Sequence, residues 1–264
     1  MSPILRIHLA GQFDDRAVSA RWVPSTESYP PHVEALIDTA WQRTLAVPGV
    51  KLFDGPMCRL ESWRSCGKAL VLNLSRTSYR RFLGTTLSHP DLADRLGPCA
   101  LANPVGVSPA LVSSDGHLLM GRRNAAVAYY PHRVHPFSGA LEPRDPLDLF
   151  AELRRELHEE LHFAPEHIAS MHLTGIAEDL SIRQPELICL VHSTLARDAI
   201  LERVQPDEHH AAWHCPADPT DLARVLTADE SFTPIAIASL LLYGRLAFGQ
   251  AWYDRQRRPF IDGD

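Results

Sequence analysis

One stretch of this chain decides how the rest is interpreted: LFAELRRELHEELH, residues 149–162. At helical spacing, its leucines and Phe150 form an apolar stripe, and an adjacent face gathers Glu152, Glu156, Glu159 and Glu160. Because like charges one turn apart repel, this acidic face lowers helix stability unless a cation lies among the carboxylates. Mg²⁺ takes carboxylate oxygens as ligands and would supply that charge. From the charge pattern alone, a solvated acidic face is the alternative interpretation.

The order of residues 155–163, RELHEELHF, adds a second argument. It resembles the second half of the Nudix box, whose pattern is Gly-x5-Glu-x7-Arg-Glu-U-x-Glu-Glu-x-Gly-U, where U is an apolar residue. Arg155, Glu156, Glu159 and Glu160 match this pattern in register, and so do the apolar positions. The resemblance indicates that the metal-binding half of the box is intact.

Three positions depart from the Nudix pattern. His162 stands where the pattern has its last glycine, and Leu147 stands where it has its first glutamate. Gly139, the nearest upstream glycine, lies two residues too far from Arg155. The resemblance therefore implies a remodelled loop in front of the helix, which bears on the substrate class more than on the metal site.

The sequence around this helix predicts an α/β fold. Residues 105–112 and 117–123 read as two strands on either side of a Ser-Asp-Gly turn, a pattern typical of a hairpin. Asp145 and Pro146 predict the start of the central helix, as its N-cap and its first residue. Further elements are predicted as strands at 182–191 and 211–215 and as a helix at 221–226. The resemblance implies that these elements form a Nudix α/β/α sandwich.

The first part of the chain is predicted to be a smaller α+β extension. Residues 1–98 form this unit in the prediction, and residues 99–264 form the Nudix domain, with breaker residues at the boundary. Apolar spacing predicts a helix over residues 33–45, and strand-like runs follow at 58–63 and 69–74.

Two segments of this extension are similar to one branch of the Nudix proteins, which hydrolyses UDP-glucose and UDP-galactose. They are LFDGP at residues 52–56 and TSYRRFLGT at residues 77–85. Shorter matches keep the same order at residues 103–107, 174–177 and 185–187. The resemblance covers the chain from about residue 50 to about residue 245. It implies that the extension recognises the nucleotide.

The resemblance also implies a Mg²⁺ site on the acidic face, with Mn²⁺ as a substitute. Glu156 and Glu160, one helical turn apart, are the predicted direct ligands. Glu159 is predicted to bind a second ion or to act as general base, and Arg155 to hold a carboxylate in place. Glu152 is expected to form a salt bridge or to face solvent. Other candidates for a ligand or a base stay open: Glu142, Glu178, Glu186 and Glu208.

A uracil base needs an aromatic face for stacking and polar partners for its edge. Phe53 and Tyr79 are the predicted aromatic residues, and Asp54 and Thr85 are the predicted polar partners. The alternative is that both aromatic residues belong to the core.

Two arginines end the predicted strand at residues 117–123. Because side chains alternate along a strand, Arg122 and Arg123 point to opposite faces. One of them is predicted to bind phosphate and the other to face away, and the sequence does not decide between them.

The composition argues against several other classes of protein. A net charge of −6 and a pI near 6.1 argue against a nucleic-acid-binding surface. The five cysteines include no C-x-x-C pair. The fourteen histidines show no zinc spacing, and three are expected on the surface: His209, His210 and His214.

One apolar run, at residues 235–243, is too short to span a membrane. It follows Thr233 and Pro234, a typical helix start, and therefore predicts a buried helix near the C-terminus. No secretory signal pattern is present at the N-terminus, so the chain is expected to be cytoplasmic, without a membrane partner.

Together these observations predict a Mg²⁺-dependent Nudix pyrophosphatase that splits a UDP-sugar, UDP-glucose or UDP-galactose, into UMP and sugar 1-phosphate. A Nudix hydrolase of ADP-ribose or a dinucleotide is the first alternative, because the same glutamates would serve it. A Nudix-fold binding module without turnover is the second, and the intact Glu156, Glu159 and Glu160 argue against it. The sequence does not determine the oligomeric state.

Overall fold

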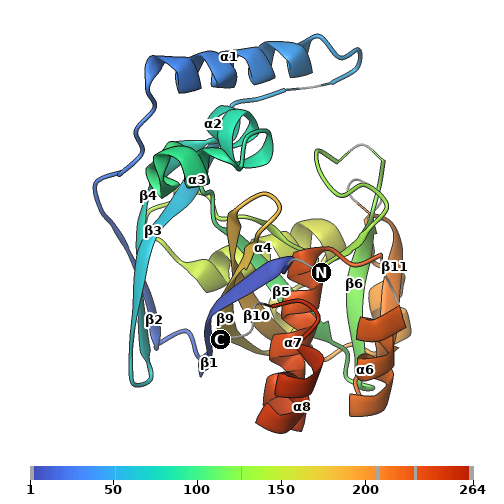
Figure 1. The fold of residues 1–264 in the computed structure, drawn as a ribbon. Coiled ribbons are helices and arrows are strands. Elements are labelled where there is room, and N and C mark those ends of the chain that lie inside the picture. The colour runs from blue at the N-terminus through green and yellow to red at the C-terminus, as the bar shows by residue number, and fades with distance from the viewer. Residues whose placement is uncertain (1–2, 51, 126, 206–208, 229–230, 262–264) are drawn as a thin grey trace.

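The computed structural model describes residues 3–50, 52–125, 127–205, 209–228 and 231–261, which form two β-sheets with helices packed around them (Figure 1). The larger sheet has the strand order β1-β9-β10-β5-β6-β11, with β7 beside β6 and β8 beside β5. Its strands are β1 (Leu5–Phe13), β5 (Gly106–Val112), β6 (His117–Arg123), β7 (Val134–His135), β8 (Gly139–Ala140), β9 (Ile168–Asp179), β10 (Gln184–Ser193) and β11 (His209–Pro216). The smaller sheet has the order β2-β4-β3, from β2 (Val18–Trp22), β4 (Ala69–Ser78) and β3 (Pro56–Cys66).

Helices cover both faces of the larger sheet. The helices are α1 (Pro31–Leu45), α2 (Tyr79–Phe82), α3 (Leu92–Leu96), α4 (Leu149–Leu161), α5 (Arg197–Leu201), α6 (Pro219–Ala228), α7 (Pro234–Phe248) and α8 (Gln250–Gln256). In Figure 1, α4 lies behind the sheet, and α7 lies in front of it with α6 and α8 close by. The predicted α/β/α sandwich is confirmed by this arrangement.

Strand β5 explains why both faces are covered, since it is buried over its whole length. Alternate side chains of a strand point to opposite faces. Val107 and Leu111 join the core cluster that contains the leucines of α4, whereas Ala110 and Val112 join the cluster that contains α7. The predicted hairpin is also present, because Leu111 pairs with Leu119 next to the turn.

Helix α4 begins three residues later than the sequence predicted. Its N-cap is Asp148, whose carboxylate accepts hydrogen bonds from the backbone nitrogens of Phe150 at 2.9 Å and Ala151 at 3.0 Å. The prediction that Asp145 caps the helix with Pro146 in its first turn is therefore wrong. A carboxylate that satisfies two free N–H groups of the first turn outweighs the preference of proline for that turn.

One departure from the Nudix pattern lies at the other end of α4. His162 lies just after the last helical residue with φ 51° and ψ 36°, the left-handed conformation. Helices often end on a glycine in this conformation, because a Cβ is strained there. His162 therefore occupies, with strain, a backbone position that suits the glycine found there in the pattern.

The N-terminal segments contain the predicted helix, as α1, and both predicted strands, as the longer β3 and β4. Strand β1 pairs with β9 and so belongs to the larger sheet. The smaller sheet contributes Leu70, Leu72 and Leu74 to the cluster that contains the α4 leucines. A boundary near residue 98 stays a prediction.

The predicted C-terminal helix is confirmed as α7. The Thr233 hydroxyl caps it by accepting a hydrogen bond from Ala236 N at 3.2 Å, and Pro234 is its first residue. Among the described residues, no helix is both long enough and apolar enough to cross a membrane.

His162→Gly is expected to raise the free energy of unfolding by about 1 kcal/mol, because glycine adopts the left-handed conformation without a Cβ clash. Urea denaturation measures the change. His162→Ala is the control: alanine keeps the Cβ and is expected to give no gain. Equal stability of the glycine variant and the wild type would contradict the assignment of strain to His162.

Candidate active site

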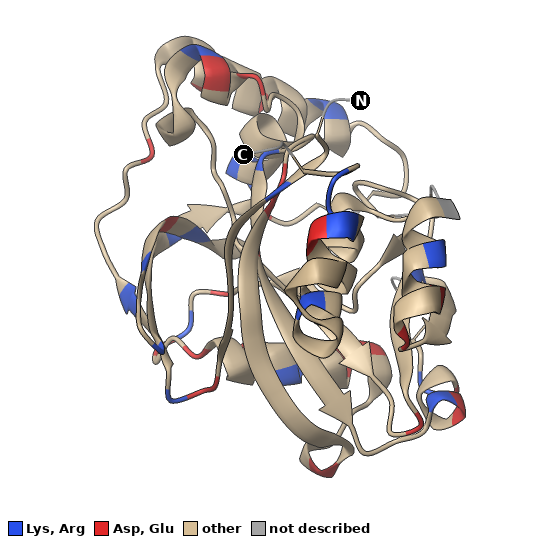
Figure 2. Ribbon diagram, turned by 60° about the horizontal axis from the view of Figure 1, so that its bottom comes forward, with Lys and Arg blue, Asp and Glu red and all other residues tan. Residues whose placement is uncertain are grey.

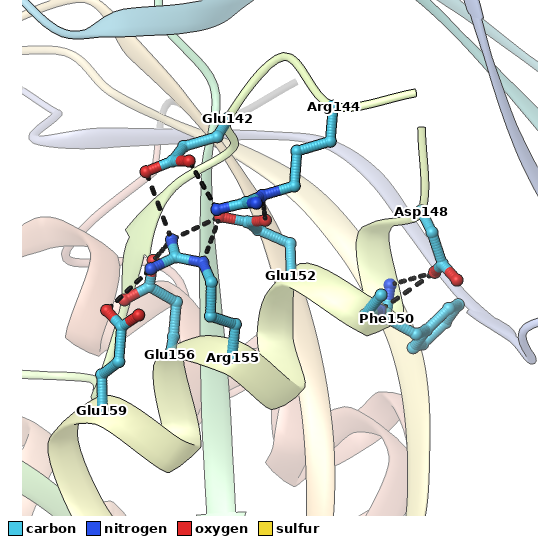
Figure 3. Close-up of polar contacts among 9 residues, drawn as sticks. Glu142, Arg144, Asp148, Phe150, Glu152, Arg155, Glu156 and Glu159 are labelled. Atoms are coloured by element: carbon cyan, nitrogen blue, oxygen red, sulfur yellow. Dashed lines mark hydrogen bonds and ion pairs between the residues drawn. The ribbon is translucent and has the colours of Figure 1, made fainter. Parts of the chain in front are cut away.

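The acidic face of α4 is held together by one arginine. Arg155 donates from Nε to Glu152 at 3.0 Å and from Nη1 to Glu159 at 2.7 Å, and its Nη2 also bonds Glu152 and Glu156 (Figure 3). Glu152 and Glu156 are buried, whereas the Glu159 side chain is 54% exposed. The expected salt bridge of Glu152 is therefore present, and Arg155 contacts carboxylates as predicted.

A second arginine joins from the loop before α4. Arg144 donates to Glu142 at 2.8 Å and lies 3.5 Å from a Glu152 oxygen, while Glu142 also lies 3.8 Å from Arg155 (Figure 3). Across most elements of the chain, basic and acidic residues are interspersed (Figure 2). In this cluster, four carboxylates share two guanidinium groups. The surplus negative charge suits a site for a cation.

Burial raises the pKa of Glu156 to about 8, and the neighbouring carboxylates Glu160, Glu159 and Glu152 act in the same direction, whereas Arg155 opposes them. The carboxyl group of Glu156 lies against Gly139, where a Cβ would be only 2.0 Å from it. The glycine that lies off the Nudix spacing in the sequence is thus the residue that makes room for Glu156.

The fourth glutamate of the face, Glu160, is held from another element. Its Oε2 accepts a hydrogen bond from Nε2 of His209 at 3.2 Å, and both residues are buried. The prediction that His209 lies on the surface is wrong, because Gly121 on the neighbouring strand leaves room for the imidazole ring. His210 and His214 are exposed, as predicted.

A cleft of about 390 Å³ opens beside the acidic face. Its aromatic wall consists of Tyr79, Phe82 and Tyr129. The Phe82 ring is tilted against Tyr79 at 5.9 Å and packs edge-on against Tyr129 at 6.1 Å. Arg123 also lines it, with its guanidinium 4.8 Å from the Tyr129 ring and its buried Nε without a hydrogen-bond partner. Gly139 lines the cleft as well and, through its contact with Glu156, joins the cleft to the acidic face.

Glu186 reaches the same cleft from β10. It is buried and accepts hydrogen bonds from the Ser108 hydroxyl and from the Gln184 side-chain amide, both at 3.1 Å. Burial raises its pKa to about 8, because the Ser108 hydrogen bond and the Arg123 charge only partly offset the desolvation of the carboxylate.

The four open candidates for ligand or base separate into groups. Glu142 lies at the acidic face and Glu186 lines the cleft. Glu178 instead pairs with His8 at 2.9 Å, on the part of the large sheet formed by β1 and β9. Glu208 lies outside the described residues.

The structure brings only two of the six predicted nucleotide-binding residues to the cleft: Tyr79 and Arg123. Arg122 points the other way and donates to the backbone oxygen of His132 at 3.0 Å. Phe53 is 77% exposed, and its neighbour Asp54 accepts a hydrogen bond from Arg80 N at 2.8 Å.

Thr85, the fourth residue outside the cleft, is fully buried. Its hydroxyl donates to the Arg81 backbone oxygen at 2.6 Å and accepts from Ala102 N at 3.0 Å. Phe82 and Tyr129 are cleft residues that the sequence did not predict. Phe82 lies within the segment that carried the resemblance, whereas Tyr129 lies in a loop without a pattern.

A larger hollow of about 570 Å³ lies between β1, β3 and α3. Its charged groups are paired with one another: Arg59 lies 3.0 Å from Glu61, and Arg183 lies 2.6 Å from Asp94. The smaller cleft is the better candidate, because it joins an aromatic wall and Arg123 to the acidic face through Gly139.

Comparison with known proteins gives relatives at modest identity. No family model matches the chain. The chain is 31% identical over 201 residues to uridine diphosphate glucose pyrophosphatase NUDT22 of Bos taurus, covering 63% of this chain and 68% of that protein. It is 26% identical over 276 residues to the Homo sapiens protein of the same name, covering 89% and 90%.

Solved structures with a similar arrangement were also found. DR0079 from Deinococcus radiodurans matches with a TM-score of 0.40 and 17% identity, over 53% of this chain and 80% of that chain. A NUDIX hydrolase from Nitrosomonas europaea matches with a TM-score of 0.35 and 16% identity, over 53% and 87%.

The raised pKa of Glu186 predicts how stability depends on pH. A carboxyl group with a folded-state pKa near 8 stabilises the fold below its unfolded pKa and loses that contribution as the pH rises through 8. Between pH 6 and pH 9, wild type is expected to lose on the order of 2 kcal/mol more stability than Glu186→Gln, which cannot ionise. Urea denaturation without metal at both pH values measures this. The same loss in both proteins would show that Glu186 ionises at its ordinary pKa.

Proposed function

The chain belongs to the family of the uridine diphosphate glucose pyrophosphatase NUDT22, and from this premise we propose that it hydrolyses a UDP-sugar. The proposed substrates are UDP-glucose and UDP-galactose, and the products are UMP and sugar 1-phosphate. The names of the relatives support this substrate class. The observation that carries the proposal is the aromatic cleft, which meets the acidic face of α4 at Gly139.

We further propose that Glu156, Glu159 and Glu160 hold Mg²⁺, or Mn²⁺ in its place. Carboxylate oxygens are the donors that Mg²⁺ prefers, and the surplus of carboxylates over guanidinium groups supports a cation at this face. Within the described residues, no three ligand side chains are already grouped as a metal site, so the carboxylates that Arg155 gathers must turn to take the ion. When bound, such an ion polarises phosphate oxygens and acidifies a bound water.

The side chains of the cleft have separate roles in this proposal. The uracil ring stacks against the wall formed by Tyr79, Phe82 and Tyr129. Arg123 donates its free Nε–H to a phosphate oxygen and is fixed in direction by the Tyr129 ring. Arg155 is a positioning residue, since its guanidinium holds carboxylates rather than facing the cleft.

Two carboxylates are candidates for the general base that accepts a proton from the attacking water. Glu159 is the exposed member of the acidic face, and Glu186 lines the cleft with a pKa near 8. A base works best when its pKa lies near the working pH, which favours Glu186.

The N-terminal extension, residues 1–98, is proposed to recognise the nucleotide. Met57, Tyr79 and Phe82 support this role, because they line the cleft from segments before residue 98. The residues from 99 onward supply the carboxylates and Arg123.

The test is hydrolysis of UDP-glucose, UDP-galactose, GDP-mannose, ADP-ribose and NADH, with Mg²⁺ and with EDTA. Wild type is expected to release UMP from the UDP-sugars only with Mg²⁺. Glu160→Gln is expected to lower kcat/KM roughly 100-fold or more, because it removes a proposed ligand. The matched control is Glu166→Gln, which changes the same charge at an exposed position and is expected to keep full activity.

The outcomes of this panel separate the alternatives. Turnover of ADP-ribose or NADH in place of the UDP-sugars would discard the proposed substrate and keep the hydrolase. Turnover in EDTA, or equal activity of the two glutamine variants, would discard the proposed metal site. A Mg²⁺-dependent thermal shift with UDP but no hydrolysis of any compound would favour a binding module.

Gly139→Ala is expected to lower kcat/KM roughly 100-fold while the melting temperature stays within about 3 °C of wild type. The atoms nearest to the added Cβ belong to the flexible end of Glu156, so the fold can adjust while the carboxylate moves. An assay with UDP-glucose and a thermal melt are both required. An active variant would show that the position of Glu156 beside Gly139 is not needed for the reaction.

A further inference from the structure

A buried histidine lies behind one of the proposed metal ligands. His209 begins β11 with only 2% of its surface exposed, and its Nε2 donates to Glu160 Oε2 at 3.2 Å. The hydrogen bond crosses from the sheet to the helix, since β11 pairs with β6 whereas Glu160 belongs to α4. Nothing in the Nudix pattern covers residue 209.

The imidazole ring of His209 is fixed by its neighbours. Gly121 lies under it, and a Cβ at that position would be 2.2 Å from the ring nitrogen Nδ1. The Phe137 ring packs edge-on against it, with 5.2 Å between centroids and an interplanar angle of 83°. The backbone of His209 is held by its pairing with Arg123. The donor nitrogen therefore has little freedom to turn away from Glu160.

The glutamates of the acidic face thus have two kinds of support. Arg155 holds Glu152, Glu156 and Glu159 from within their own helix. His209 holds Glu160 from β11, in the adjacent sheet. A carboxylate that accepts a hydrogen bond from an outer partner keeps a fixed orientation toward a bound cation.

We infer that His209 is a positioning residue, which orients the Glu160 carboxylate for the divalent cation through its Nε2–H donor. The inference rests on the proposed function, because that function makes Glu160 a metal ligand. Outer hydrogen bonds to metal ligands typically change metal affinity by 10- to 100-fold. His209 itself is not a ligand in this proposal, since its Nε2 is directed at the carboxylate.

Two amide variants of His209 distinguish the effect of its Nε2–H donor from the effect of its ring packing. In glutamine, the side-chain nitrogen reaches about as far from the backbone as Nε2 of histidine, whereas in asparagine it stops one carbon short. His209→Gln is therefore expected to keep the hydrogen bond and His209→Asn to lose it. Both replacements are polar and remove the imidazole ring, but asparagine is also one methylene smaller than glutamine, so a buried histidine replaced by asparagine elsewhere must serve as the control for lost packing.

The measurement is a titration of the metal-free full chain with Mn²⁺, in which the electron paramagnetic resonance signal of the free ion reports how much Mn²⁺ is bound. His209→Asn is expected to raise the Kd for Mn²⁺ about 10- to 100-fold, and His209→Gln to stay within about threefold of wild type. The matched control is His135→Asn, since His135 is also buried but bonds the Thr233 hydroxyl at 2.8 Å. Its Kd is expected to equal that of wild type.

Three outcomes would overturn the inference: wild-type affinity in His209→Asn, an equal loss in His209→Gln, or an equal loss in His135→Asn. Gly121→Ala is a second variant, which displaces the ring without removing it and is expected to weaken Mn²⁺ binding as His209→Asn does. Wild-type protein that binds no Mn²⁺ at millimolar concentration would overturn the inference together with the metal site. Mn²⁺ binding that depends on His209 in a protein without UDP-sugar turnover would keep the inference and discard only the substrate.

Discussion

The gathering of like-charged carboxylates on one side of α4 is the constraint on which the rest of the site depends. Desolvation and mutual repulsion both disfavour their charged forms, as the raised pKa of Glu156 indicates. The proposed function needs these carboxylates charged, so neighbouring residues must stabilise them in place. Arg155 does so within the helix, and a hydrogen bond from β11 does so from the sheet. Two guanidinium groups leave part of the negative charge unbalanced, and this is the charge that we propose binds the metal ion.

Three glycines on neighbouring strands make this burial possible. Gly139 faces the carboxyl group of Glu156, Gly106 faces that of Glu186, and Gly121 faces the ring of His209. At each position a Cβ would lie within 2.5 Å of the polar side chain. Each polar group therefore lies directly against backbone, where any other residue would push it away. The glycines of the larger sheet thus leave the space that the polar side chains of the site occupy.

The sequence predicted the helix, its acidic face and the sandwich, because periodic spacing of apolar residues depends only on local geometry. It did not predict the start of the helix, since Asp145 and Asp148 both offer a cap and only the tertiary path of the loop selects one. It also placed His209 on the surface, because the space over Gly121 exists only once two distant strands pair. Tyr129 was missed for the same reason: a loop residue becomes part of a cleft only through long-range packing.

The cleft combines parts that lie far apart in the sequence, so their relative positions must be fixed by packing. Tyr79 directly follows β4, whose Leu72 and Leu74 share a core cluster with Leu153 of α4. Because β4 and α4 share that core, β4 cannot shift relative to α4 without opening a cavity between them, and this limits where the start of the aromatic wall at Tyr79 can lie. An enzyme that holds a base at one end of its substrate and cleaves a phosphate bond at the other needs this fixed distance. The shared core thus links the smaller sheet to the proposed metal ligands of α4, although the smaller sheet itself carries no proposed metal ligand.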